Sequence, residues 1–357
     1  MKGLTDIDKN FNLKTNIVEE GLTFLSVLEE PFTIYGVKYI DGKFRRLEER
    51  IAKTTNDGVY ACSANTAGGR IKFKTNSPYV AINVIMNEIG RLSHFPLTGY
   101  AGFDLYVDDE NGKESYVNTF IPPHNIKNTY EGIIYLGNDR EKEVTINMPL
   151  YCEVYYLCIG IKKGSLLKKS GHKYINKKPI VYYGSSITQG GCASRPGNSY
   201  QGIISRDLNC DFINLGFSGS AMGEDVIMKY IASLDMSVFV YDYDCNAPDK
   251  EHLEKTHERG FKIIRQAHPD LPIIIMPRPN RNFTANGLTR AKIIKKTYEN
   301  AVKNGDKNVY FISSKQLTAI CKNEGTVDNL HPNDYGFYSM AKAVERVLKE
   351  IIRNRQL

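Results

Sequence analysis

The sequence lacks tryptophan and uses cysteine sparingly. Among 357 residues there are no Trp and seven Cys. The cysteines are scattered and odd in number, and no pair lies two residues apart, so neither a disulfide framework nor a zinc site is indicated. We expect free, buried thiols. They are Cys62, Cys152, Cys158, Cys192, Cys210, Cys245 and Cys321. Without Trp, any surface that stacks on a sugar ring has to be built from Tyr or Phe.

Long apolar runs are also missing. The first twenty residues contain no apolar core of the kind a secretion signal needs, and no later run approaches the ~18 residues that span a bilayer. If the chain begins at its native start, we expect it to be cytoplasmic, with no membrane partner. The composition of 41% hydrophobic and 24% charged residues is that of an ordinary soluble globular protein.

Positive charge is modest for this length, with a formal net charge of +7. Much of it lies in lysines between Lys162 and Lys178, and no aromatic residues interleave the central ones to stack on bases. We therefore interpret this segment as a solvated linker and expect no nucleic-acid partner. The chain is long enough for two domains. We place a β-sandwich at residues 1–160, the linker at 161–178 and a second domain at 179–357.

The first domain shows strand signals. Apolar residues alternate with polar ones at 71–74, 103–107 and 144–148, as in antiparallel sheets with one buried and one wet face. Asn111-Gly112 is typical of a hairpin turn. Many short strands predict an all-β jelly roll or sandwich. The one helix we predict here is brief, at 44–52.

The pattern changes after Pro179. Continuous apolar runs of four residues predict buried parallel strands at 180–183, 212–215, 238–241, 273–276 and 309–312. Helical stretches lie between and after them, and Asn198, three residues before Gln201, forms a near capping box. They are predicted at 198–209, 223–233, 249–267 and 288–304, with a last helix from Phe337 to Ile351. This alternation predicts an α/β domain, a three-layer doubly wound parallel sheet.

Chemistry-bearing residues gather at one edge of that sheet. The first buried strand stops at Gly184-Ser185-Ser186, so Ser186 projects from a strand end where open α/β sheets bind ligands. Asp328 stands three residues before His331, close enough to orient the imidazole. The order Ser, Asp, His is consistent with hydrolytic triads built on parallel sheets.

Two further strand ends could supply donors to an oxyanion. Gly219 follows the second strand and can offer a backbone N–H, and Asn246 follows the third and can offer a side-chain amide. Each is weak alone, since glycine there is usually a turn and asparagine a cap. Their joint placement with Ser186 and His331 on one rim is the specific signal.

Because of four short sequence blocks, the second half, about residues 179–352, resembles the SGNH hydrolase family of GDSL-type esterases and lipases. The blocks are Gly184 to Thr188, Asn214 to Gly219, Asp244 to Ala247 and Asp328 to His331. The resemblance implies Ser186 as nucleophile, His331 as base, Asp328 as its orienter, and an oxyanion hole from Ser186, Gly219 and Asn246. It implies no metal or organic cofactor. Ser185 stands where the family usually has Asp, and Asp-Cys-Asn-Ala replaces Gly-x-Asn-Asp, which leaves the placement of Asn246 less certain.

The first half resembles the β-sandwich domain that precedes the catalytic domain in one subgroup, named for its Gly-x-Asp-Leu-Tyr motif. The matching residues are Phe44 to Leu47, Thr66 to Phe73 and Gly102 to Tyr106. That subgroup is associated with carbohydrate esterases, so the resemblance implies a serine esterase acting on short-chain, acetyl-type esters of O-acetylated carbohydrate. The partner is then a small-molecule or oligosaccharide ester.

Alternatives remain open at this point. The same triad would serve a lipid or thioester hydrolase or a sugar acetyltransferase. If the changed block from Asp244 to Ala247 has lost the oxyanion hole, the chain would instead be a non-catalytic carbohydrate-binding protein. Cys192 and Cys245 flank the site, but nothing near them in sequence lowers a thiol pKa. Arg278, Asn280 and Arg281 follow the fourth strand and either line the pocket or belong to a solvated loop.

Overall fold

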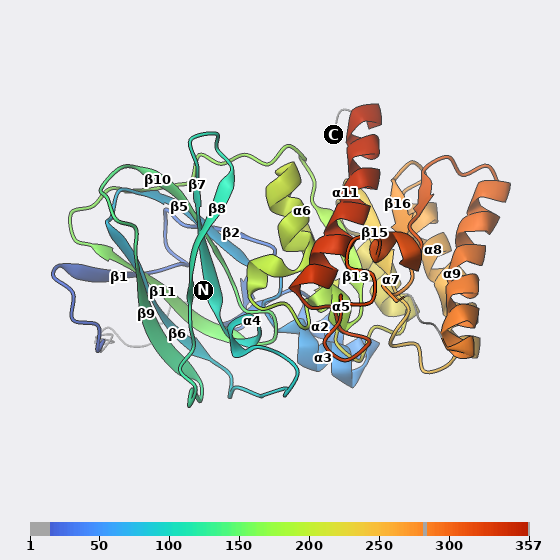
Figure 1. Ribbon diagram of the computed structural model, residues 1–357, viewed down its shortest axis with the longest axis horizontal. Helices are drawn as coiled ribbons and strands as arrows, with labels where there is room; N and C mark the ends of the chain where they lie inside the picture. The colour runs from blue at the N-terminus through green and yellow to red at the C-terminus, as the bar shows by residue number, and fades with distance from the viewer. Residues whose placement is uncertain (1–14, 281–283, 356–357) are drawn as a thin grey trace.

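The computed structural model describes residues 15–280 and 284–355. Figure 1 shows a β-sheet body formed by the first half of the chain beside an α/β body formed by the second half. The predicted fold class, a doubly wound parallel sheet preceded by an all-β sandwich, is confirmed. Within the described residues, no helix is both long enough and apolar enough to cross a membrane.

The first body is a sandwich of two antiparallel sheets. One sheet has the order β1-β11-β6-β9, and the other has the order β12-β5-β10-β7-β8 with β2 also paired to β5. Ile71 and Phe73 of one sheet and Val80 and Ile82 of the other share a single buried core. The strands, with the separate β3-β4 hairpin, are β1 (Leu22–Ser26), β2 (Thr33–Tyr35), β3 (Lys38–Ile40), β4 (Lys43–Arg45), β5 (Arg70–Thr75), β6 (Tyr79–Met86), β7 (Phe103–Asp108), β8 (Glu114–Phe120), β9 (Thr129–Tyr135), β10 (Lys142–Asn147), β11 (Val154–Lys162) and β12 (Leu167–Lys168).

The predicted hairpin and strand alternation occur where expected. Asp108 pairs with Glu114 across the turn, and Gly112 has a φ of 72°, a conformation that glycine adopts without a steric penalty. However, the prediction that the second face of the sheet containing β5, β7 and β10 is exposed to solvent was wrong. Lys72 and Asp104 are fully buried, because segments of the second half and of the 161–178 region cover that face. The polar residues of the alternation are therefore buried in an interface.

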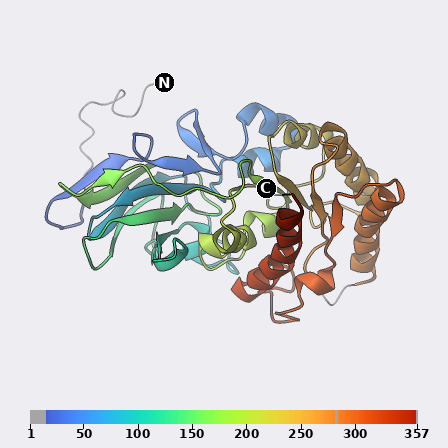
Figure 2. The same ribbon diagram turned by 90° about the horizontal axis from the view of Figure 1, so that it is seen from above.

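The helix predicted at 44–52 was only partly right. Phe44 belongs to β4, and helix α2 covers Glu49–Thr55. Two helices were missed, α3 (Asp57–Ser63), capped by the Asn56 side chain, and the short α4 (Leu97–Tyr100). Figures 1 and 2 show α2 and α3, drawn in blue, against the α/β body. Side chains of this segment, such as Leu47 and Val59, share a core with that body.

The second body has a five-stranded parallel sheet with the order β14-β13-β15-β16-β17. All five predicted strands are present, and they are β13 (Ile180–Gly184), β14 (Phe212–Gly216), β15 (Val238–Asp242), β16 (Ile273–Ile275) and β17 (Val309–Phe311). Ile180 and Tyr182 point into one core, whereas Val181 and Tyr183 point into the other. Burial of both faces explains why the runs are continuously apolar.

Helices cover both faces of this sheet. Helices α6 and α11 pack over the core that contains Tyr182, and α7, α8 and α9 pack over the core that contains Tyr183. Ser199, not Asn198, caps α6, because a 3₁₀ turn at Pro196–Asn198 shifts its start. The helices are α5 (Ser186–Gln189), α6 (Tyr200–Leu208), α7 (Asp225–Ala232), α8 (Lys250–Ala267), α9 (Ala285–Lys303), α10 (Ser314–Leu317) and α11 (Asp334–Arg355).

Candidate active site

The structure joins Ser186, His331 and Asp328 in one chain of hydrogen bonds. Ser186 Oγ lies 3.0 Å from His331 Nε2, and His331 Nδ1 lies 2.7 Å from Asp328 Oδ2. An ionised carboxylate only accepts, so Nδ1 carries the ring proton and Nε2 is left as the acceptor for the serine hydroxyl. A hydroxyl, a base and a group that orients the base are thus in contact, although Ser186 and His331 are 145 positions apart in the sequence.

Ser186 sits in a tight strand-to-helix turn between β13 and α5. Ser185 caps the helix, since its Oγ accepts from the Ile187 N–H at 3.2 Å, which is the role an Asp would play there. A Cβ on Gly184 would lie 2.4 Å from the Asp242 backbone oxygen, and one on Gly216 would lie 2.2 Å from the Gln189 nitrogen. Glycine at both strand ends therefore lets the helix that carries Ser186 pack directly on the sheet edge.

The loop before α11 sets the histidine. The carboxylate of Asp328 accepts backbone N–H bonds from Leu330 and His331 at 3.0 and 2.7 Å. Asn329 takes a φ of 67°, which asparagine tolerates better than most residues. Burial alone would raise the pKa of Asp328, but the bonds from the His331 ring and from these two N–H groups outweigh it and lower the pKa. Asp328 is thus held as an anion.

The oxyanion candidates lie at neighbouring strand ends. Gly219 is exposed with a φ of 70°, and none of the hydrogen bonds among the described residues uses its N–H. Ser186 occupies the first turn of α5, where backbone N–H groups have no partner within the helix. Asn246 follows β15, and its Oδ1 is buried without a partner in the described part of the chain. An amide oxygen only accepts, so a bond from Asn246 to an oxyanion has to come from the Nδ2 group of the same amide.

The loop from Asp244 to Ala247, which departs from the family pattern, is held by a buried cluster of ion pairs. Asp244 accepts two side-chain bonds from Arg278 at 3.0 Å and one from Arg290 at 3.0 Å, and Arg290 also reaches the Ala247 backbone oxygen at 2.9 Å. Burial would raise the pKa of Asp244, but the two guanidinium groups lower it. These bonds fix the loop on both sides of Asn246. The alternative that Arg278 lies in a solvated loop was wrong, while Arg281 lies outside the described residues.

Residues of the first half support the site, and the sequence alone did not identify them. The Tyr151 hydroxyl donates to the Ser186 backbone oxygen at 3.3 Å. Gln189 links both halves, since it donates to Asn65 Oδ1 at 3.0 Å and accepts from the Ser218 N–H at 2.9 Å. Their contact partners lie more than 25 residues away in sequence, so no local pattern reveals them.

His94 was also missed. It lies between β6 and α4 in the first half, yet its ring centroid is 5.2 Å from that of His331, with the planes 39° apart. Ligand atoms of His94, Asp328 and His331 all lie within 4.8 Å of one another, so these three side chains could share a metal ion. A histidine in a loop carries no sequence signal that would pair it with a residue 237 positions away.

The two flanking cysteines are poor nucleophiles. Burial raises the pKa of Cys192 to about 12, with a contribution from nearby Asp328. Burial likewise raises the pKa of Cys245 to about 12. Both thiols stay protonated at neutral pH, and all seven cysteines are free. Ser186 is therefore the better candidate.

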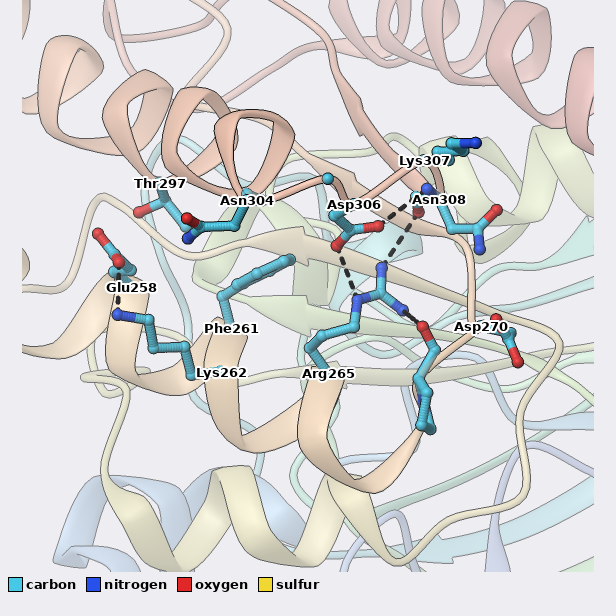
Figure 3. Close-up of a pocket in the computed structure, with 13 residues that line it drawn as sticks. Glu258, Phe261, Lys262, Arg265, Asp270, Thr297, Asn304, Asp306, Lys307 and Asn308 are labelled. Atoms are coloured by element: carbon cyan, nitrogen blue, oxygen red, sulfur yellow. Dashed lines mark hydrogen bonds and ion pairs between the residues drawn. The ribbon is translucent and has the colours of Figure 1, made fainter.

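A cavity of about 470 Å³ lies away from the triad, between α8 and the segment that precedes β17. Figure 3 shows that four of its charged groups already form two ion pairs, Arg265 with Asp306 and Lys262 with Glu258. The cavity borders the amino ends of β16 and β17, whereas Ser186 follows the carboxyl end of β13. Because open α/β sheets bind ligands at the carboxyl edge, this cavity is not a candidate substrate site.

Both halves of the chain resemble known proteins. Residues 177–349 match the model of the GDSL-like lipase/acylhydrolase family, and residues 22–167 match the domain described as the N-terminus of SGNH-hydrolase-type esterases, with the Gly-x-Asp-Leu-Tyr motif. A Bacteroides ovatus protein described as a GDSL-like lipase is 31% identical, and the match covers 93% of this chain and 98% of that one, with a TM-score of 0.83. The chain belongs to the GDSL-like lipase/acylhydrolase family. It is thus of the esterase and acylhydrolase class.

Two solved structures of lower sequence identity share the fold. A salicylyl-acyltransferase from a tetracycline biosynthetic pathway is 18% identical with a TM-score of 0.75, and the match covers 94% of this chain and 98% of that one. An acetyl xylan esterase from Butyrivibrio proteoclasticus is 12% identical with a TM-score of 0.59, over 92% and 98% of the two chains. Among curated proteins, no match to the chain was found.

Proposed function

We propose that this GDSL-like protein is a serine esterase that hydrolyses short-chain acyl esters, chiefly acetyl esters of carbohydrates. The observation that carries the proposal is the hydrogen-bond chain from Ser186 through His331 to Asp328. In this proposal Ser186 is the nucleophile, His331 is the base, and Asp328 holds the ring in the required tautomer.

The acylation step follows from these contacts. Ser186 Oγ attacks the ester carbonyl while its proton passes to His331 Nε2, and the imidazolium that forms is stabilised by Asp328. The N–H groups of Ser186 and Gly219 and the amide of Asn246 would donate to the oxyanion. His331 then protonates the leaving alcohol, and an acyl-serine remains.

Deacylation repeats the same chemistry with water. His331 removes a proton from a water molecule, which attacks the acyl-serine, and Ser186 regains its proton as the acid leaves. No step requires a metal or an organic cofactor. The exposed fractions of 19% for the His331 side chain and 35% for that of Asp328 are consistent with an open site that water reaches easily.

The choice of an acetylated carbohydrate rests on shared architecture. The acetyl xylan esterase has the same two-body fold over nearly its whole length. An open site at the rim suits a bulky oligosaccharide alcohol carrying a small acyl group better than a long acyl chain, which needs an apolar channel.

A fluorophosphonate probe and a panel of esters test the proposal. Only an activated serine reacts with the probe, so we expect labelling at Ser186 in the wild-type protein and none in Ser186→Ala. Ser185→Ala is the matched control, because it removes a cap worth about 1 kcal/mol but leaves the proposed nucleophile. Absence of labelling in the folded wild-type protein would favour a non-catalytic carbohydrate-binding protein instead.

Acyl transfer is a second candidate. The likeness to a salicylyl-acyltransferase over 94% of the chain favours it, because the same acyl-serine can react with an alcohol in place of water. Product analysis with an acetyl donor and increasing sugar acceptor separates the two. Acetylated acceptor as the main product would support transfer, and free acetate would support hydrolysis. Preference for p-nitrophenyl esters of long acyl chains would instead indicate a lipid hydrolase.

A further inference from the structure

The first half of the chain places an imidazole against the catalytic candidates. His94 belongs to the loop between β6 and α4, and its ring faces that of His331 at a centroid distance of 5.2 Å. Neither ring nitrogen of His94 has a hydrogen-bond partner among the described residues, so both remain free to bind a ligand. The preceding residues Arg91 to Ser93 are exposed and His94 itself is partly exposed, so its side chain is not enclosed in the core.

Three donor groups converge at this point. One nitrogen from each of His94 and His331 and one oxygen of Asp328 lie within 4.8 Å of one another. A tetrahedral Zn²⁺ holds its ligands about 2.0 to 2.2 Å from the metal, which puts them about 3.3 Å from each other. A change in the His94 rotamer and a small loop shift would bring the donors to that spacing. Two imidazoles and a carboxylate are a donor set that suits Zn²⁺ and Cu²⁺.

We propose that His94, Asp328 and His331 form a binding site for a divalent transition-metal ion such as Zn²⁺, and that occupancy of this site inhibits the enzyme. Metal at Nδ1 of His331 replaces the proton bound toward Asp328, which is released to solvent, whereas metal at Nε2 takes the lone pair that accepts the Ser186 proton. Either way His331 can no longer act as a base. The inhibitory part rests on the proposed function, but the binding does not.

A second set of donors in the protein does not support the same inference. Asp108, Glu114 and His172 also lie within 4.8 Å of one another in the first half. There the ammonium of Lys72 is ion-paired to Glu114 and donates to Thr145 at 2.9 Å, and its side chain is 1% exposed. A buried cation already balances that carboxylate and would repel a metal ion. His172 therefore offers a matched control.

Titration calorimetry with ZnCl₂ tests the binding directly. We expect one Zn²⁺ per chain in the wild-type protein and in Ser186→Ala, since the serine is not a ligand. His94→Gln, which keeps a polar side chain of similar size, should weaken binding by about tenfold or more, because loss of even an outer-sphere partner has that effect. Asp328→Asn should weaken it as well, and His172→Gln should leave it unchanged. Circular dichroism verifies that each variant is folded.

Inhibition is measured on ester hydrolysis, with each protein normalised to its own rate in EDTA. We expect Zn²⁺ to inhibit the wild-type protein reversibly, and His94→Gln to need about tenfold more Zn²⁺ for the same inhibition. Equal binding in wild-type and His94→Gln, no binding at all, or loss of binding only in His172→Gln would each overturn the proposal. A wild-type protein that binds one Zn²⁺ through His94 but cleaves no ester would support the metal site and refute the esterase.

Discussion

The guanidinium of Arg46 donates from Nη1 to the backbone oxygen of Gly216 at 2.6 Å, deep between the two halves of the chain. Its other bonds go to the backbone oxygens of Asn65, Cys62 and Asn214 and to the side-chain Oδ1 of Asn214. No carboxylate among the described residues pairs with it. Burial lowers the pKa of Arg46 to about 10, so the group is still protonated at neutral pH. Residue 46 thus anchors the strand end that leads to Gly219.

Arg46→Met should lower both stability and turnover. Loss of its charged hydrogen bonds leaves buried carbonyls unpaired, so we expect a decrease of about 3 kcal/mol in the free energy of unfolding. Displacement of the loop with Gly219 should reduce kcat by up to about 10²-fold. Arg45→Met is the control, because Arg45 pairs with Glu49 at 2.8 Å and, among the described residues, forms no hydrogen bond with this loop. Equal kcat in both variants would contradict the assignment.

Asp328→Asn should reduce turnover while leaving the fold intact. An amide can donate to Nδ1 of His331 and so favour the wrong tautomer, and in related triads such a change lowers kcat by about 10⁴-fold. We expect a smaller loss of about 10²- to 10³-fold, because the Asp328 side chain is 35% exposed and water can partly replace it. Steady-state kinetics and thermal unfolding measure the two effects. A kcat within twofold of wild type would exclude Asp328 as the orienting group.

Asn246→Ala should reduce kcat by about 10²- to 10³-fold with little change in KM, the usual result of removing one oxyanion donor. Asn246→Asp should be worse, since it replaces a donor with a negative charge beside the developing oxyanion. Hydrolysis of a chromogenic acetate by the three proteins gives the comparison. If Asn246→Ala retained full kcat, the oxyanion would have to be stabilised by backbone N–H groups alone.

Asp242 should make folding stability depend on pH. It lies at the end of β15 and accepts from Thr188 Oγ1 at 2.7 Å and from the Tyr200 hydroxyl at 3.2 Å. Burial raises its pKa to about 7, from 3.8. The folded state therefore holds the proton more tightly, and the contribution to stability is fully present below about pH 4 and lost as the pH rises through about 7.

Asp242→Asn should remove that dependence, because the amide is neutral at every pH and keeps an acceptor oxygen. We expect the free energy of unfolding of the variant, relative to wild type, to rise by a few kcal/mol between about pH 4 and about pH 8. Urea denaturation at several pH values gives the difference. A constant difference across this range would show that Asp242 titrates alike in the folded and unfolded states.

The parallel sheet and the blocks of the candidate site could be predicted because their signals are local. Buried parallel strands are continuously apolar, and each block directly follows a strand or precedes a helix. Local reasoning failed where the two halves meet. Lys72 and Asp104 look solvent-facing in sequence, yet ion pairs with Glu114 and with Arg195 let them be buried. Phe44 shortly precedes a helix in the sequence, but it lies in β4 and pairs with Tyr39 of β3.

Contacts between the first and the second half of the chain could not be predicted. Arg46, His94 and Tyr151 act on groups more than 30 residues away, and only folding brings them together. Arg46 lies within the Phe44 to Leu47 segment that resembles the Gly-x-Asp-Leu-Tyr domain, but nothing in that segment indicates its partner. The catalytic roles of Ser186, Asp328 and His331 and the oxyanion roles of Gly219 and Asn246 stay predictions.

The division into residues 1–160, 161–178 and 179–357 also stays a prediction. Strand β11 ends at Lys162, and β12 lies inside the expected linker.

The bond from Tyr151 to the Ser186 backbone has a practical consequence for anyone who wishes to shorten the protein. A fragment starting near Pro179 would keep every proposed catalytic side chain. It would lack Tyr151, the Asn65 partner of Gln189, and Arg46, which donates to the Gly216 backbone oxygen. Such a fragment should expose apolar surface and aggregate. Active versions of this enzyme should therefore be sought among chains that keep both halves.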